Sequence, residues 1–318
     1  MRALLTNRKA QILLNAGFGV LLLIVAFFSA RHFLHAGWPL HHTKPWLVVA
    51  SAVLFFVAYA FKAWGWQRLF AKHERPSSQS LAFAGGAACV GGIALPGRID
   101  DALRIAVVKR FPGTRCGLGT VGLSLIVLGL LDNAALTPLA SVAAVSSSSM
   151  LVRAGFLVVA VAGVLAALLI GFLPMIARWQ RVTRYRGGRW LASHTHCTKE
   201  AGAAWLLVSV SWGLRGTAVF LLLDALSLKG SFALALAFLC ASAASAALPI
   251  APAGAATQAG AGAAILIASG MKGTEALAFS VAAQALVIVT GAAVMLIITA
   301  WQVALRVKPH VQRAYATL

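Results

Sequence analysis

Residues 80–98 read SLAFAGGAACVGGIALPGR, and residues 231–252 read SFALALAFLCASAASAALPIAP. Both stretches open on serine, continue through Gly- and Ala-rich apolar residues and reach Ala-Leu-Pro near their ends. In each case a short segment follows and closes at Gly113 or Gly270, before another long apolar stretch. Matched apolar segments interrupted by Gly and Pro indicate the central binding site of a transporter-like membrane protein. We therefore expect the chain to move a substrate rather than to change it chemically.

The composition excludes a soluble globular domain. The chain is 60% hydrophobic and 11% charged, with a mean hydropathy of +0.87, whereas soluble domains are roughly 45–50% apolar and about 25% charged. Long apolar runs reach or approach the roughly 17–25 residues that a helix needs to cross a bilayer. These runs lie at 12–30, 46–61, 117–139, 151–177, 203–226 and 275–301. A β-barrel would instead show alternating segments of about ten residues, so the sequence predicts an all-α polytopic membrane protein.

The distribution of Lys and Arg predicts the topology. If the two interrupted stretches dip into the membrane and return to the face they entered from, six full crossings remain. Of the 27 basic residues, 20 then lie on the side of both termini and five on the other, with Lys62 and Arg215 inside spans. This bias obeys the positive-inside rule and predicts cytoplasmic N- and C-termini in a bacterial inner membrane. Full crossings by the interrupted stretches would weaken the bias.

The same topology predicts one integral membrane domain, 1–318, built from inverted half-units at about 46–139 and 204–305. The first interrupted stretch enters from the cytoplasm and the second from outside, so the two form re-entrant broken helical hairpins in an inverted repeat. Each half of such a repeat can adopt the conformation of the other, which opens a central site to either face in turn.

The net charge of +20 would suggest nucleic acid as a partner in a soluble protein. Here the cations lie between apolar spans, so we expect anionic lipid headgroups at the cytoplasmic face as partners, and no nucleic acid. The four cysteines form no Cys-x-x-Cys pair, and we expect neither a metal site nor a cofactor. No Gly-x-x-x-x-Gly-Lys-Ser/Thr motif occurs that would bind ATP.

Short motifs around both breaks resemble a known family. The first half of the resemblance consists of Leu95-Pro96-Gly97-Arg98, Asp101, Arg104 and a span ending Leu130-Leu131-Asp132. The second consists of Leu248-Pro249-Ile250-Ala251-Pro252-Ala253-Gly254 with Gly270. The chain is similar, over about residues 10–305, to the transmembrane domain of lysylphosphatidylglycerol synthases. It looks like one of the free-standing, flippase-like relatives without the soluble synthase domain. The resemblance implies translocation of an anionic or polyprenyl-linked lipid between leaflets.

Several charges of that family are missing from this chain. Leu128 and Gly129 stand where the family usually has a Glu-Arg pair, and Gln258 and Gln284 stand where it commonly has an acid and a base. The loss leaves three interpretations open: a more neutral substrate headgroup, a divergent mechanism or lost activity.

The breaks themselves are the first candidate site. Pro96 with Gly97, and Pro249 and Pro252 with Gly254, interrupt any helix, because proline removes a backbone donor and clashes with the preceding turn. A helix that starts after each break points its partly positive N-terminus toward the protein centre, where free N–H groups bind phosphate. The alternative is a pair of Pro-kinked helices with no site.

Arg98, Asp101 and Arg104 form the second candidate, because a spacing of three places them on one helix face. Arg98 is predicted to clamp a lipid phosphate with both ends of its guanidinium. Asp101 would then hold Arg98 or Arg104 in position. The alternative is an interfacial helix with solvated ion pairs.

Charged and amide side chains within the spans complete the candidate site. Asp132 and Arg215 lie deep in apolar spans and each needs a partner, so we predict a structural Asp132–Arg215 ion pair, with a proton-coupling or substrate role for Asp132 as the alternative. Lys62 is expected to extend toward the membrane surface. Gln258 and Gln284 would either bind a headgroup or join helices.

The sequence therefore predicts a lipid translocase that is not an enzyme and binds an anionic, polyprenyl or polycyclic lipid headgroup between the broken segments. A lipid-modifying transferase is the first alternative, although the sequence offers no His/Asp/Glu cluster for acid–base chemistry. A non-catalytic partner in a lipid or glycolipid biosynthesis complex is the second, and a small-solute transporter the third. A homo-oligomer or a biosynthetic enzyme would be the protein partner.

Overall fold

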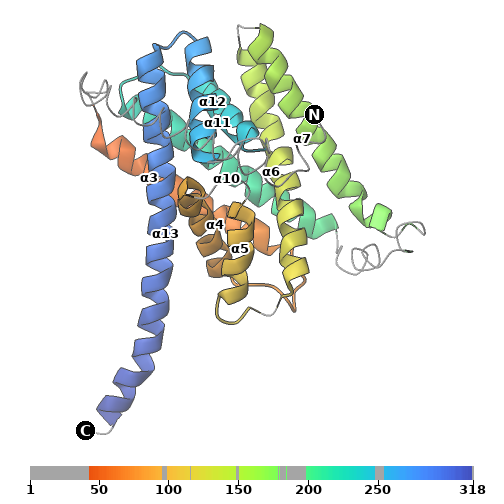
Figure 1. Ribbon diagram of the computed structural model, residues 1–318, viewed down its shortest axis with the longest axis vertical. Helices are drawn as coiled ribbons and strands as arrows, with labels where there is room; N and C mark the ends of the chain where they lie inside the picture. Colours follow the sequence, from red (N-terminus) through yellow and green to blue (C-terminus); the bar gives the residue numbers. More distant parts are fainter. Residues whose placement is uncertain are drawn as a thin grey trace, which may run out of the picture.

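The computed structural model describes residues 43–94, 99–114, 116–147, 150–177, 198–247 and 254–316, together with Trp179 and Arg184. Within these residues every regular element is a helix (Figure 1). The helices are α3 (Pro45–Gln67), α4 (Ser78–Ala94), α5 (Ile99–Arg110), α6 (Leu118–Ser146), α7 (Met150–Ala177), α10 (Thr198–Ala225), α11 (Phe232–Ala247), α12 (Gly254–Ala268) and α13 (Gly273–Ala316).

Five of these helices are long and apolar enough to cross a membrane, which confirms an all-α polytopic membrane protein. Their apolar parts are Pro45–Gln67, Leu118–Ser146, Val152–Ile176, Glu200–Ala225 and Gly273–Ala304. They coincide with five of the six predicted runs, and the predicted run at 12–30 lies outside the described residues. The last helix, α13, continues to Ala316, well past the end of its apolar run.

Helices α3 and α10 pack antiparallel along their whole length and form the centre of the fold. Polar contacts join them at several depths. The hydroxyl of Ser51 donates to the carbonyl of Ala218 at 2.7 Å. The hydroxyl of Ser211 donates to the carbonyl of Ala58 at 2.8 Å. Such contacts hold two helices in one register where lipid supplies no hydrophobic driving force between them.

Ion pairs close both ends of the α3–α10 contact. Lys44 Nζ lies 2.9 Å from the carboxylate of Asp224 at one end, and Arg68 lies 3.4 Å from that of Glu200 at the other. Between them, Gly65 of α3 allows a close approach, because a β-carbon there would lie 2.9 Å from Val208 and 3.1 Å from the carbonyl oxygen of Ala204. The two helices therefore form one rigid central unit.

Two pairs of short helices flank the α3–α10 unit. In each pair, one helix precedes a predicted break and the other follows it. Helix α4 ends at Ala94 and α5 begins at Ile99, whereas α11 ends at Ala247 and α12 begins at Gly254. Pro96, Gly97, Pro249 and Pro252 fall between these helices, outside the described residues. The predicted closing glycines both have left-handed backbone, with φ of 84° at Gly113 and 93° at Gly270, a conformation that glycine adopts without strain at helix ends.

The two short-helix pairs lie in opposite halves of the molecule, α4 and α5 below and α11 and α12 above in the view of Figure 1. Each pair packs on a long helix from the other end of the chain, α4 on α13 and α11 on α6. At the α4–α13 contact, a β-carbon on Gly86 would lie 2.6 Å from the carbonyl oxygen of Gly291. The two halves of the sequence therefore interlock.

Replacing Gly86 with alanine is expected to force α4 away from α13 and to destabilise the protein by about 1–3 kcal/mol, the usual cost of overpacking. Thermal unfolding of the purified protein in detergent measures this effect. Gly129→Ala is the matched control, because a β-carbon at Gly129 meets nothing within 4 Å. Equal unfolding midpoints for the two variants would contradict the tight α4–α13 contact.

Candidate functional site

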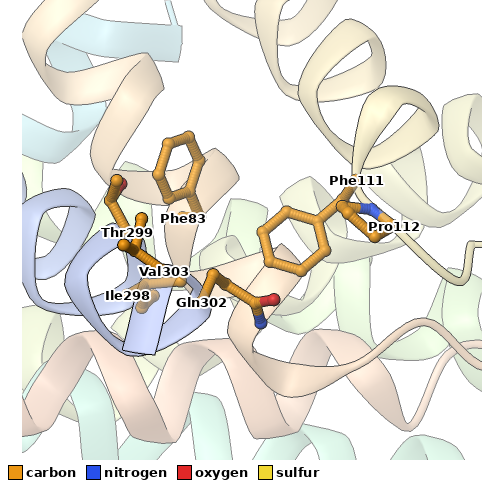
Figure 2. A pocket seen from close by; sticks show the side chains of 7 residues that line it. All are labelled: Phe83, Phe111, Pro112, Ile298, Thr299, Gln302 and Val303. Carbon is orange, nitrogen blue, oxygen red and sulfur yellow. The ribbon is translucent and has the colours of Figure 1, made fainter. Parts of the chain in front are cut away.

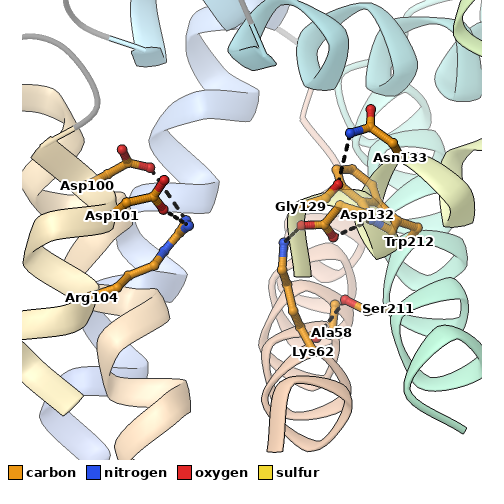
Figure 3. Close-up of polar contacts among 10 residues, drawn as sticks. All are labelled: Ala58, Lys62, Asp100, Asp101, Arg104, Gly129, Asp132, Asn133, Ser211 and Trp212. Carbon is orange, nitrogen blue, oxygen red and sulfur yellow. Dashed lines mark hydrogen bonds and ion pairs between the residues drawn. The ribbon is translucent and has the colours of Figure 1, made fainter. Parts of the chain in front are cut away.

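Asp132 holds the centre of the candidate site. It lies at the midpoint of α6 and has two partners from other helices. Lys62 Nζ of α3 donates to Asp132 Oδ2 at 2.8 Å, and Trp212 Nε1 of α10 donates to Asp132 Oδ1 at 2.9 Å (Figure 3). Both carboxylate oxygens are therefore bound, as a charge inside an apolar span requires.

The predicted Asp132–Arg215 pair is wrong, and so is the prediction that Lys62 extends toward the membrane surface. Lys62 reaches inward instead and supplies the positive charge that Asp132 needs. The physical reason is that Trp212, one turn before Arg215, occupies the second oxygen of the carboxylate. Asp132 thus accepts from α3 and α10 together and ties α6 to the central helix pair.

Arg215 lies on aromatic rings beside this pair. Its guanidinium carbon is 5.6 Å from the ring centroid of Tyr59 and 5.1 Å from that of Trp212, within the range of cation–π attraction. Lys62 Nζ is 5.5 Å from the same Trp212 ring. We call these five residues, Tyr59, Lys62, Asp132, Trp212 and Arg215, the central cluster.

The central cluster is partly accessible. The side chains of Lys62 and Asp132 are 21% and 22% exposed, although both lie within long apolar helices. The Tyr59 hydroxyl donates to Cys89 Sγ of α4 at 2.8 Å, so the cluster also touches the first short-helix pair. The ion pair is therefore not completely enclosed by the helices around it.

Arg104 faces the central cluster from α5. Its guanidinium is 2.9 Å from Asp101 and 3.7 Å from Asp100. This contact fits both the predicted positioning of Arg104 by Asp101 and the alternative of solvated ion pairs on one helix. Figure 3 shows Arg104 pointing from α5 toward the helices that carry Lys62 and Asp132. Arg98, the predicted phosphate clamp, lies outside the described residues.

Gln258 and Gln284 are half-buried, on α12 and α13. The backbone carbonyl of Gln258 accepts a hydrogen bond from Ser242 of α11 at 3.0 Å, which joins the second short-helix pair. Among the described contacts of Lys62 and Asp132, neither glutamine takes part, so their predicted headgroup role stays a prediction. In the part of the chain that the structure describes, no three His, Cys, Asp or Glu side chains gather to hold a metal.

Sequence reasoning missed Lys62, Tyr59 and Trp212 as site residues, although the spacing contains a signal for them. Pro249 follows Pro96 by 153 residues, and Arg215 follows Lys62 by the same number. Trp212 likewise follows Tyr59 by 153 residues. Applying the spacing of the two breaks to the charged and aromatic residues of the spans would have selected these two pairs.

A second feature is a mostly apolar cavity of about 200 Å³ near the start of α4. Figure 2 shows the side chains that line it: Phe83, Phe111, Pro112, Ile298, Thr299, Gln302 and Val303. Two of them, Phe83 and Phe111, have ring centroids 6.1 Å apart. Gln302 Nε2 donates to Oε1 of Gln79 at 3.1 Å and joins α13 to α4 at the cavity.

Comparison with known proteins agrees with the resemblance found in the sequence. The family model described as Lysylphosphatidylglycerol synthase TM region matches residues 12–297. The match includes the central cluster, both short-helix pairs and most of α13. No curated protein and no solved structure gives a significant match.

Proposed function

Since the chain belongs to the lysylphosphatidylglycerol synthase TM family, we propose that it is a flippase-like translocase that moves a lipid between the leaflets of a bacterial inner membrane. The single observation that carries this proposal is the partly exposed ion pair that Lys62 makes with Asp132 at the midpoint of α6. Ionisable side chains inside a membrane are costly and mark pathways for polar groups. A lipid headgroup is the polar group that a translocase must pass through the apolar core.

The proposed architecture has six crossings, cytoplasmic termini and two re-entrant hairpins, α4–α5 and α11–α12, in inverted half-units. The α3–α10 contact supports this symmetry. Ser51 of α3 contacts Ala218 of α10. At the spacing of 153 residues, Ser51 corresponds to Ala204 and Ala218 corresponds to Gly65, and these two residues are also in contact. Two such halves can exchange conformations, and the exchange exposes the central cluster to each face in turn.

In the proposed mechanism, the headgroup binds between α5 and the central cluster. Arg104 points from α5 toward the helices that carry Lys62 and Asp132, and Arg98, at the first break, would bind the phosphate from the same short-helix pair. The positive N-terminus of the helix after the break adds to the attraction. Gln258 and Gln284 would line the opposite half. The lipid tails would stay in the apolar surroundings throughout.

We further propose that the chain performs transport without chemistry and needs no cofactor. Its driving force would be an ion gradient, the membrane potential or consumption of the lipid on one side. The missing family charges favour a second candidate, a non-catalytic partner in a lipid-synthesis complex. At those positions Leu128 is buried in the core and Gly129 faces open space.

Reconstitution tests the proposal. The purified chain is placed in liposomes with a lipid that carries a fluorescent headgroup, and dithionite added outside reports how fast inner-leaflet lipid becomes accessible. We expect faster exposure than in empty liposomes and in liposomes that hold Asp132→Asn. Rates equal to those of empty liposomes for anionic, zwitterionic and polyprenyl-phosphate lipids alike would overturn the translocase and favour the partner role.

Filling the cavity with a larger side chain is expected to slow transport. We expect an acyl chain of the lipid to occupy the cavity, against its apolar walls, at the start of the transport path. Thr299→Trp places an indole against Phe83 and Phe111, and we expect the transport rate to fall about threefold to tenfold, the effect of losing roughly one buried methylene contact or two. Thr299→Val is the control of similar size to threonine. Equal rates for the two variants in the liposome assay would exclude the cavity from the path.

A further inference from the structure

Lys62 and Arg215 occupy corresponding places in α3 and α10. They share the spacing of 153 residues with the two breaks, as do Tyr59 and Trp212. Their contacts correspond as well. Lys62 lies over the ring of Trp212 at 5.5 Å, and Arg215 lies over the ring of Tyr59 at 5.6 Å. Exchanging the two halves would therefore exchange the two cations, each with an aromatic ring of the opposite helix beneath it.

The correspondence fails at one group, the carboxylate. Lys62 has Asp132, but Arg215 has no acid. The chain contains seven Asp and Glu residues, and all of them lie in the described part. Six bind other cations: Asp100, Asp101, Asp132, Glu200, Asp224 and Glu275. The seventh, Glu74, lies in the turn after α3, where its backbone N–H donates to the carbonyl of Ala71. The chain has no carboxylate left for Arg215.

The surroundings of Arg215 confirm that a partner is missing. Its Nε is buried and has no hydrogen-bond partner among the described residues, although buried polar groups in native proteins are almost always paired. The face of α13 that meets Tyr59 carries the backbone carbonyl of Val287 and the hydrogen atoms of Gly291. The ring centroids of Tyr59 and Trp212 lie 5.6 Å and 5.1 Å from the guanidinium carbon. A guanidinium carries its N–H donors in its own plane, in a fork that matches the oxygens of a phosphate.

We propose that Arg215 binds the phosphodiester of the translocated lipid, which carries a single negative charge. The phosphodiester would be the counterion of Arg215, as Asp132 is the counterion of Lys62. This inference rests on the proposed lipid transport. The guanidinium fork binds two oxygens of one phosphate side by side, a geometry that lysine cannot offer. The central cluster has one uncompensated positive charge, two cations against one carboxylate, so one negative charge neutralises it.

Binding to the full-length protein in lipid nanodiscs tests this assignment without requiring transport. The probes are spin-labelled phosphatidylglycerol, which carries one phosphodiester charge, spin-labelled diacylglycerol, which carries none, and inorganic phosphate as the free anion. We expect Arg215→Gln to weaken phosphatidylglycerol binding about tenfold or more and to leave diacylglycerol unchanged. Arg215→Lys should fall between wild type and Arg215→Gln. Arg153→Gln is the control, because it removes one basic charge far from the cluster, beside Ser147.

Three results would overturn the assignment. One is a folded Arg215→Gln protein that binds phosphatidylglycerol as wild type does. Another is that inorganic phosphate binds in a way that depends on Arg215, and phosphatidylglycerol does not compete with it. The ligand of Arg215 would then be a free anion and not a lipid. If Arg215→Gln does not fold, phosphatidylglycerol with a photoreactive headgroup is applied to the wild-type chain. Labelling of α3 or α10 near Tyr59 and Arg215 supports the assignment, and labelling elsewhere alone overturns it.

The binding experiment in nanodiscs and the transport experiment in liposomes test the two proposals separately. A protein that binds phosphatidylglycerol through Arg215 but does not exchange lipid in liposomes would refute the translocase and leave the anion site in place. A protein that exchanges lipid with unchanged binding in Arg215→Gln would refute the anion site and leave the translocase in place.

Discussion

Asp132→Asn is expected to destabilise the protein by about 2–4 kcal/mol and to abolish lipid exchange. Breaking one side of a buried ion pair costs about 3–5 kcal/mol, because the remaining charge loses its partner. The lower figure applies here because Lys62 and Asp132 are each about one-fifth exposed. Asparagine can still accept a hydrogen bond from Trp212 Nε1, so the substitution removes the negative charge and keeps this hydrogen bond. Thermal unfolding in detergent and the liposome assay measure the two effects.

A double-mutant cycle separates stability from function at this pair. Lys62→Met combined with Asp132→Asn removes both charges, and we expect it to recover most of the lost stability while lipid exchange stays at the level of empty liposomes. The pair would then serve transport rather than folding alone. A double variant that exchanges lipid at the wild-type rate would show that the ion pair is purely structural.

Arg104→Gln is expected to slow lipid exchange about tenfold or more, equivalent to about 1.4 kcal/mol, while stability falls by only about 0.5 kcal/mol. Its ion pairs with Asp100 and Asp101 lie within one helix, and such pairs contribute about 0.2–0.5 kcal/mol each. A large effect on transport therefore requires a contact outside α5, with the headgroup.

Arg110→Gln is the control for Arg104→Gln. Arg110 is the last residue of the same helix and is exposed, so the substitution removes the same charge without facing the central cluster. Transport rates are compared at equal protein density in liposomes. If both variants slow exchange equally, the effect of Arg104 is one of surface charge and not of headgroup binding.

The helices follow from the sequence because their causes are local. A continuous apolar run of membrane length requires a helix, and proline requires an interruption, so the described spans and the ends of α4 and α11 appear where the runs and breaks predicted them. The left-handed glycines at 113 and 270 follow for the same reason. Local chemistry determines each of these features within a few residues.

The partners of the charged residues do not follow from the sequence, because they depend on how separate helices pack. Asp132 had two cations within reach in principle, Lys62 and Arg215, and the packing of α3 and α10 on α6 decides between them. Lys62 lies five residues before the end of α3, where a lysine usually turns to the surface. Only the Asp132 carboxylate on a neighbouring helix explains why it turns inward.

The contact between Gly86 of α4 and Gly291 of α13 also constrains how the protein is made. Chains fold from the N-terminus during synthesis, yet the first short-helix pair packs on α13, which begins only at Gly273. After insertion, the glycine face of α4 stays uncovered while the 178 residues between Ala94 and Gly273 are synthesised. An N-terminal fragment that stops before α13 would therefore remain a substrate for membrane proteases, and the cell would acquire a stable protein only after α13 has been synthesised and inserted.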